Sequence, residues 1–276
     1  MFIRLANVSE SNDASGINDV CETLDCIANI YRAIGDNQKA LLFFEQCLKR
    51  RVRTANAALP DIDQFTLLVR TYEDVITLTK SQAKAHKNNN DQWEKLGTLF
   101  VEVGKLYDLH LNKQMKALTC FHSALQIFKE GNFYKQIENT LSLIGAVHVK
   151  KSAHQKALKC FNDSLVIQRT HSQTNETTEI ADTLHNIGNC EASLGHFENS
   201  LLSFKEALRI KKKIYTAVHL SIAKTEHCTG LVMSQLGNLG DALMLFQSSL
   251  SIRKALLGCD HLDVSFSLHR LVIALV

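Results

Sequence analysis

Residues 195–213 read GHFENSLLSFKEALRIKKK, and the recurrence of this stretch along the chain indicates the fold. After an initial glycine come Ser200, Phe204, Ala207 and Leu208. Offsets of four, three and one place these four residues on one side of an α-helix. The stretch therefore predicts an amphipathic helix that presents a small–aromatic–small–leucine stripe to a neighbour.

Four other stretches carry the same stripe, starting at Gly35, Asn112, Ser152 and Gly237. Its aromatic position is occupied by Phe44, Phe121, Phe161, Phe204 and Phe246. From Ala117 onward, the residues at the first small position lie 40, 43 and 42 residues apart. A repeat of this length built from two helices is typical of an α-solenoid, in which each helix pair contacts only its neighbours.

The helix that precedes each turn also repeats, with a glycine at Gly145, Gly188 and Gly230. A glycine inside a helix costs about 1 kcal/mol relative to alanine. We therefore expect a neighbouring helix to approach closely at these positions, for example with Gly188 facing the small residue Ala207.

Composition narrows the function classes. The single proline in 276 residues favours a chain that is helical almost throughout. The 31 basic and 28 acidic residues give a net charge of +3, which predicts no strong attraction to nucleic acid or to a membrane. Neither a signal peptide nor a membrane span is recognisable, and the eight cysteines form no metal-binding pattern. We expect a cytoplasmic protein whose thiols are small buried residues.

The repeats resemble the tetratricopeptide repeat, and their period near 42 resembles the kinesin light chain type. The joining segment of that type is similar to LLGCDHLDVSFSLHRLVIAL at residues 256–275, although Leu262 replaces its proline. This resemblance implies an all-α solenoid: a right-handed superhelix of antiparallel helix pairs, with the first helix of each pair on the concave face.

We expect a flexible segment at 1–18 and a solenoid at 19–276. Recognisable repeats are predicted at 20–55, 91–130, 138–170, 179–213 and 221–256. Residues 61–90 form a degenerate repeat, predicted to be one long helix or a helix and a short polar turn, followed by a loop at 88–90. An unpaired helix is predicted at 261–276. It is interpreted as the end of a truncated product, as a cap, or as a surface for end-to-end self-association.

Candidate chemistry is sparse. His185, His227 and His269 recur every 42 residues, but neighbouring helix axes lie 8–10 Å apart, too far for three rings to share one zinc ion. The sequence has no phosphate-binding glycine loop and no G-x-S-x-G motif. We therefore expect no enzymatic activity, cofactor or metal. Basic runs at 49–53 and 209–213 end second helices, where cations complement the helix dipole.

The predicted function is a non-enzymatic adaptor that binds an extended peptide of a partner protein in the concave groove. The predicted groove residues, polar and mostly uncharged, are Asp25, Asn29, Arg32, Lys150, His185, Asn186, Asn189, His227 and Gln235. Asn186 matches a groove asparagine of the family it resembles. The alternatives are a sensor or scaffold fragment of a larger signalling protein and, less favoured, an RNA-binding solenoid.

Overall fold

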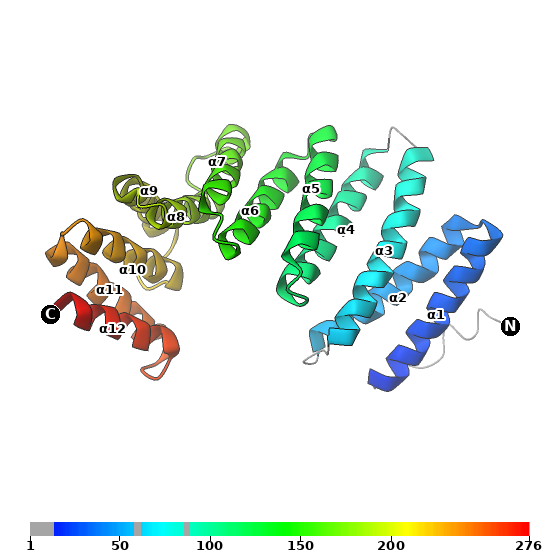
Figure 1. Cartoon of the computed structure of the whole chain (residues 1–276), viewed down its shortest axis with the longest axis horizontal. Coiled ribbons are helices and arrows are strands. Elements are labelled where there is room, and N and C mark those ends of the chain that lie inside the picture. The colour runs from blue at the N-terminus through cyan, green and yellow to red at the C-terminus, as the bar shows by residue number, and fades with distance from the viewer. Residues whose placement is uncertain (1–13, 58–61, 86–88, 276) are drawn as a thin grey trace. The chain divides into compact units, whose positions relative to one another are not determined.

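The structure is a computed structural model that describes residues 14–57, 62–85 and 89–275 (Figure 1). Within these ranges the regular structure consists of twelve helices and no strand, which confirms the predicted all-α repeat fold. The helices are α1 (Ala14–Ile34), α2 (Asn37–Ala57), α3 (Ile62–Ala85), α4 (Asn90–Leu109), α5 (Gln114–Glu130), α6 (Tyr134–Lys150), α7 (His154–His171), α8 (Thr178–Ser193), α9 (Phe197–Ile214), α10 (Leu220–Gln235), α11 (Leu239–Leu257) and α12 (Leu262–Leu275).

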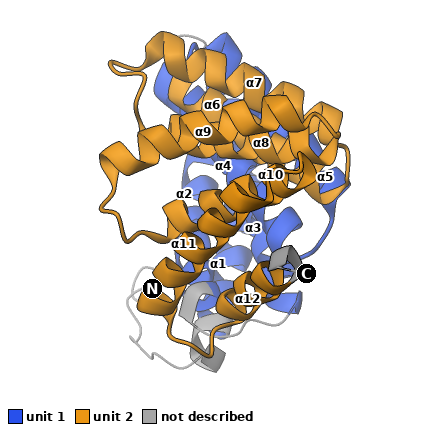
Figure 2. Cartoon of the chain, turned by 90° about the vertical axis from the view of Figure 1, so that its left-hand side faces the viewer, with its two compact units in different colours: residues 1–133 blue, residues 134–276 orange. Residues whose placement is uncertain are grey.

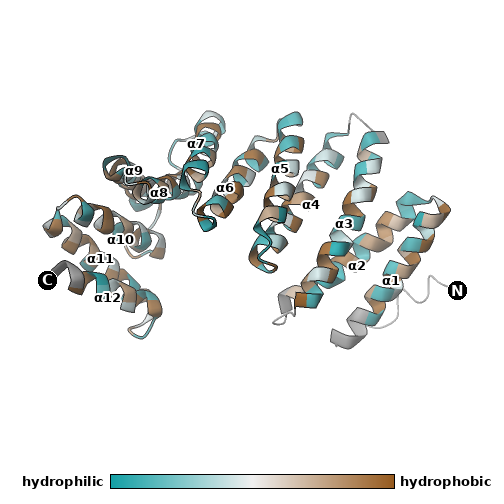
Figure 3. Cartoon of the chain, in the orientation of Figure 1, coloured by the Kyte–Doolittle hydropathy of each residue, from teal (hydrophilic) through white to brown (hydrophobic). Residues whose placement is uncertain are grey.

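The chain divides into two compact units, residues 1–133 and 134–276, coloured separately in Figure 2. Unit 1 contains the helix hairpins α1–α2 and α4–α5, with α3 packed between α2 and α4. Unit 2 contains the hairpins α6–α7, α8–α9 and α10–α11, followed by α12. Within unit 2, each second helix packs on the first helix that follows it. The helices carry apolar and polar faces along their length, as Figure 3 shows.

One contact recurs in every hairpin of unit 2 and accounts for the mid-helix glycines. A Cβ atom added to Gly145, Gly188 or Gly230 would lie only 2.7–2.8 Å from the phenylalanine ring of the second helix. The rings belong to Phe161, Phe204 and Phe246. The prediction of a close helix approach is therefore correct, but the close neighbour of Gly188 is the Phe204 ring, not Ala207. The glycine allows the ring to lie directly against the first helix.

A second recurring contact joins consecutive repeats inside each unit. Seven residues after their phenylalanine, α2, α9 and α11 place a buried cation against a hydroxyl group of the following helix, whereas α5 and α7 have Phe128 and Gln168 there. The pairs are Arg51 with Thr71, Lys211 with Thr225, and Arg253 with Ser267. The hydroxyl residue also defines a reference position in the first helix. Gly230, which contacts the phenylalanine ring, lies five residues after Thr225.

The degenerate stretch is a single helix, α3, of 24 residues. The same register from Thr71 leads to Ile76, where the paired first helices have glycine or, in α1, Ala28. A branched side chain there would block the close approach of a phenylalanine ring, which agrees with the observation that α3 forms no hairpin with a following second helix among the described helices. Of the predicted loop at 88–90, residue 88 lies outside the described residues and α4 begins at Asn90.

The ends of the chain are described only in part. Residues 1–13, most of the predicted flexible segment, lie outside the described residues, and α1 begins at Ala14. At the other end, α12 packs on α11 and buries Val264 and Ser267, whereas Leu262 and Phe266 are exposed. No helix within the described ranges has both the length and the hydropathy needed to cross a membrane.

Candidate peptide-binding surface

The predicted groove residues fall into two groups, one in each compact unit. Asp25, Asn29 and Arg32 lie on α1 in unit 1. The other six lie on the first helices of unit 2: Lys150 on α6, His185, Asn186 and Asn189 on α8, and His227 and Gln235 on α10.

The three α1 side chains are engaged inside unit 1. Asp25 forms an ion pair of 2.6 Å with the buried Arg51 of α2. Arg32 forms one of 2.8 Å with Asp74 of α3, and the Asn29 side chain bonds to Arg32 and to the Asp25 carbonyl. These groups hold α1 to its neighbours, and we leave them out of the candidate surface.

His185 is buried, which corrects its prediction as an accessible lining residue. Its side chain is 3% exposed, and its Nδ1 lies 3.1 Å from the Thr225 hydroxyl. The same hydroxyl lies 2.9 Å from the Ser221 carbonyl. Burial, aided by the charges of Lys211 and Lys224, lowers the pKa of His185 to about 3. The imidazole is therefore neutral and structural.

The other two members of the histidine series have different surroundings. His227 is half-buried beside Phe246, as His185 lies beside Phe204, with ring centroids 5.4 Å apart in both pairs. Burial lowers the pKa of His227 to about 4. His269 on α12 is exposed. The three rings therefore form no common site, and the described residues contain no cluster of three or more side chains that could hold a metal ion.

The accessible part of α8 is a stripe at offsets of four, three and four residues, opposite the buried face. The stripe consists of Asp182, Asn186, Asn189 and Ser193. The equivalent stripe on α10 consists of Lys224, Cys228, Leu231 and Gln235. Helices α8 and α10 contact each other directly (Figure 2). From this contact we infer that the two stripes are neighbours. We call Asn186, Asn189, Cys228, Leu231 and Gln235 the first-helix surface.

The centre of the first-helix surface combines amide and apolar groups. Asn186 and Asn189 are half-buried, and neither side-chain amide has a hydrogen-bond partner among the described residues. Beside them on α10, Cys228 and Leu231 are also half-buried. Burial raises the pKa of the Cys228 thiol, which is therefore neutral at pH 7 and acts as an apolar contact. Sequence reasoning missed Cys228 and Leu231, although they stand 42 residues after Asn186 and Asn189.

The remaining predicted residues lie at the margin. Gln235 is exposed at the end of the α10 stripe. Lys150 is exposed at the equivalent end of α6 and takes part in contacts within the protein. At the opposite end of α8, Asp182 pairs with the buried Lys211 at 2.8 Å. The two asparagines are thus the polar groups of α8 that are both accessible and without a partner in the described structure.

The basic run at 209–213 is neutralised locally. Its cations pair as follows: Arg209 with Glu176 and Glu206, Lys211 with Asp182, Lys212 with Glu226, and Lys213 with Glu176. A phosphate-binding surface needs cations that are available to the nucleic-acid backbone. This run therefore does not favour the RNA-binding alternative.

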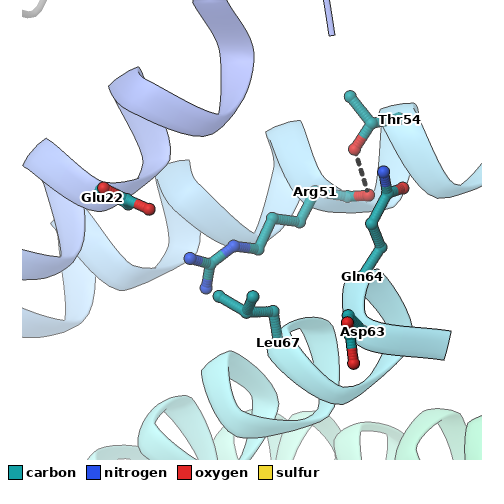
Figure 4. A pocket seen from close by; sticks show the side chains of 6 residues that line it. All are labelled: Glu22, Arg51, Thr54, Asp63, Gln64 and Leu67. Carbon is teal, nitrogen blue, oxygen red and sulfur yellow. Dashed lines mark hydrogen bonds between the residues drawn. The ribbon is translucent and has the colours of Figure 1, made fainter. Parts of the chain in front are cut away.

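Unit 1 holds a pocket of about 190 Å³ between α1, α2 and α3 (Figure 4). Its lining residues are Glu22, Arg51, Thr54, Asp63, Gln64 and Leu67. The guanidinium of Arg51 is committed to Asp25 and Thr71. The pocket thus lacks an unpaired buried group to bind a ligand, and the first-helix surface is the better candidate.

Comparison with known proteins agrees with this architecture. Two tetratricopeptide repeat models match the sequence, one at residues 136–213 and the other at 20–61 and 230–263, together more than half of the chain. No curated protein matches it.

Two solved structures show the likeness of fold. The crystal structure of BtubC (BKLC) from P. vanneervenii has a TM-score of 0.55 at 14% identity, over 80% of this chain and 92% of that one. The apo form of RapI has a TM-score of 0.54 at 22% identity, over 67% of this chain and 65% of that one. The chain belongs to the tetratricopeptide repeat family, whose helix hairpins are scaffolds for protein–protein interaction.

Proposed function

We propose that the protein is a non-enzymatic adaptor that binds an extended peptide segment of a partner protein on the first-helix surface of unit 2. The observation that supports this most directly is the pair of accessible amides, Asn186 and Asn189, that have no partner within the described structure.

An extended segment carries main-chain N–H and C=O groups that both need partners when water is displaced. An asparagine amide supplies two donors and one acceptor, so it can satisfy both kinds of group. Asn186 and Asn189 are three residues apart in a helix and are therefore neighbours on one face. Cys228 and Leu231 provide an apolar contact for one side chain of the ligand. We accordingly expect the bound segment to carry an apolar residue next to the main-chain groups held by the asparagines.

The test is a selection from a phage-displayed library of random linear peptides on the full chain, followed by titration of the selected peptides. Asn186→Asp replaces the donor half of the amide with an acceptor and should weaken binding about tenfold or more. Asn199→Asp makes the same change at an exposed position on the second helix α9 and should leave binding unchanged. Circular dichroism of both variants controls for folding. Equal binding by the two variants would remove the first-helix surface from the proposal.

We place this activity in a reducing, cytoplasmic setting, where exposed thiols such as Cys26 and Cys259 persist unpaired. End-to-end self-association through α12 stays a prediction. Sedimentation velocity at two concentrations tests it, since a dimer would shift toward higher sedimentation coefficients as concentration rises.

A further inference from the structure

Two thiols lie close together between the first two helices. Cys21 on α1 and Cys47 on α2 are both fully buried. The Cys21 sulfur lies 3.9 Å from the Cys47 carbonyl oxygen, and the Cys47 sulfur lies 3.6 Å from the Cys21 carbonyl oxygen. Each side chain therefore reaches the backbone of the other residue.

The equivalent positions are also in contact in two other hairpins. The Ser249 hydroxyl donates to the Ala223 carbonyl at 2.7 Å, and the Ser164 hydroxyl donates to the Glu138 carbonyl at 3.0 Å, in each case across 26 residues. The corresponding pair in the α8–α9 hairpin, residues 181 and 207, consists of two fully buried alanines.

A disulfide needs Cβ atoms about 3.5–4.5 Å apart, with side chains that point toward one another. The reciprocal contacts of Cys21 and Cys47 fit this requirement, because rotation about the Cα–Cβ bonds moves the sulfurs from the opposite carbonyls toward each other. We propose that Cys21 and Cys47 are a redox modification site, at which a hydroperoxide oxidises the two thiols to a disulfide that ties α1 to α2. This inference is independent of the proposed peptide binding.

The electrostatic surroundings act on the two thiols in opposite directions. The neighbouring Cys47 side chain and the charge of Arg51 lower the pKa of Cys21, and the neighbouring Cys21 side chain raises the pKa of Cys47. We assign Cys21 as the attacking thiol and Cys47 as the resolving thiol. The Cys21 thiolate attacks one oxygen of hydrogen peroxide, the O–O bond breaks and a sulfenic acid forms, while the other oxygen takes up the proton released by the Cys21 thiol and leaves as water. The Cys47 sulfur then attacks the Cys21 sulfur, the S–S bond forms and the S–O bond breaks. A second water leaves, so that two electrons have passed from the thiols to the peroxide.

Access to the buried pair requires α1 to open transiently. Among the described helices α1 packs mainly on α2, with the Arg32 ion pair to α3 as a further tie. A helix with so few neighbours opens at lower cost than one packed on both sides. A disulfide would suppress this opening, so oxidation should make α1 more resistant to hydrogen exchange.

The test treats the folded full chain with hydrogen peroxide, blocks free thiols with N-ethylmaleimide and analyses the unreduced tryptic peptides by mass spectrometry. Because Cys26 lies on the same tryptic peptide as Cys21, the experiment uses a Cys26→Ser, Cys259→Ser background, which also removes the two exposed thiols. We expect one linked peptide pair, containing Cys21 and Cys47, that has lost two hydrogen atoms and is separated by dithiothreitol. Hydrogen exchange in α1 should slow at the same time.

Three controls make the result specific. Cys21→Ala and Cys47→Ala adopt the residue type of positions 181 and 207, so both variants should fold, and each should lose the linked peptide. Oxidation in denaturant should give mixed pairings among the cysteines. The proposal is overturned if Cys21 and Cys47 of the peroxide-treated folded protein remain free thiols, or if Cys21 oxidises without being linked to Cys47.

Discussion

The contact between Gly188 and Phe204 allows a quantitative test of how the hairpins are held together. In an open helical position, replacing glycine with alanine stabilises a protein, by up to about 1 kcal/mol. At Gly188, however, the new Cβ atom would lie 2.8, 2.9 and 3.0 Å from three carbons of the Phe204 ring. The ring is 1% exposed and cannot turn away without disturbing its neighbours. Overpacking of this kind costs about 1–3 kcal/mol, so Gly188→Ala should lower the free energy of unfolding by about 1 kcal/mol after the helix gain is subtracted.

Gly240 provides the matched control. It lies in α11, has no atom within 4 Å of its added Cβ, and has no positive φ. Gly240→Ala should therefore raise the free energy of unfolding, by up to about 1 kcal/mol. The measurement is the midpoint of urea unfolding followed by circular dichroism. In a double-mutant cycle, Phe204→Leu should relieve part of the cost of Gly188→Ala. If Gly188→Ala is as stabilising as Gly240→Ala, the ring does not set the requirement for glycine.

Two further predictions concern buried polar groups of unit 2. Asp182→Asn should destabilise the fold by about 2 kcal/mol, because it leaves the 2%-exposed side chain of Lys211 without its counter-ion. Lys211→Met should be close to neutral, because the remaining Asp182 side chain is 59% exposed and can be solvated by water. The urea midpoints of both variants measure this difference, and equal losses of stability would contradict it. Burial lowers the pKa of His185 from an ordinary value near 6.5 to about 3. As the pH falls, the imidazole is therefore protonated in the unfolded chain before it is protonated in the folded protein. The free energy of unfolding should accordingly fall by about 3 kcal/mol for this residue as the pH drops from 6.5 toward 4. His185→Gln should flatten this pH dependence, and an unchanged slope would show that His185 does not carry it.

The repeat architecture was predictable because its determinants are local. The phenylalanine and glycine series are periodic in sequence, and each pair meets within a single hairpin. The unpaired state of α3 also has a sequence signal, Ile76 at the glycine position. That signal becomes readable only when the contact between Arg51 and Thr71 sets the register.

The binding surface was predictable only in part, because its polar side chains compete for partners on other helices. Sequence periodicity places Asn29, Arg32 and His185 on first helices. It does not show that Asp74 takes up Arg32 or that Thr225 lies 3.1 Å from the imidazole of His185. These partners lie 40 or more residues away along the chain. Only the packed structure separates such satisfied groups from Asn186 and Asn189.

The most direct test of the proposed binding surface is a nuclear magnetic resonance titration of the isotopically labelled chain with a peptide selected on it. The side-chain amide resonances of Asn186 and Asn189 and the backbone resonances around Leu231 should shift with a common saturation curve. Resonances of the exposed second-helix residues Asn199 and Met244 should remain in place. Saturable shifts confined to second helices, with Asn186 and Asn189 unchanged, would contradict the proposed binding mode.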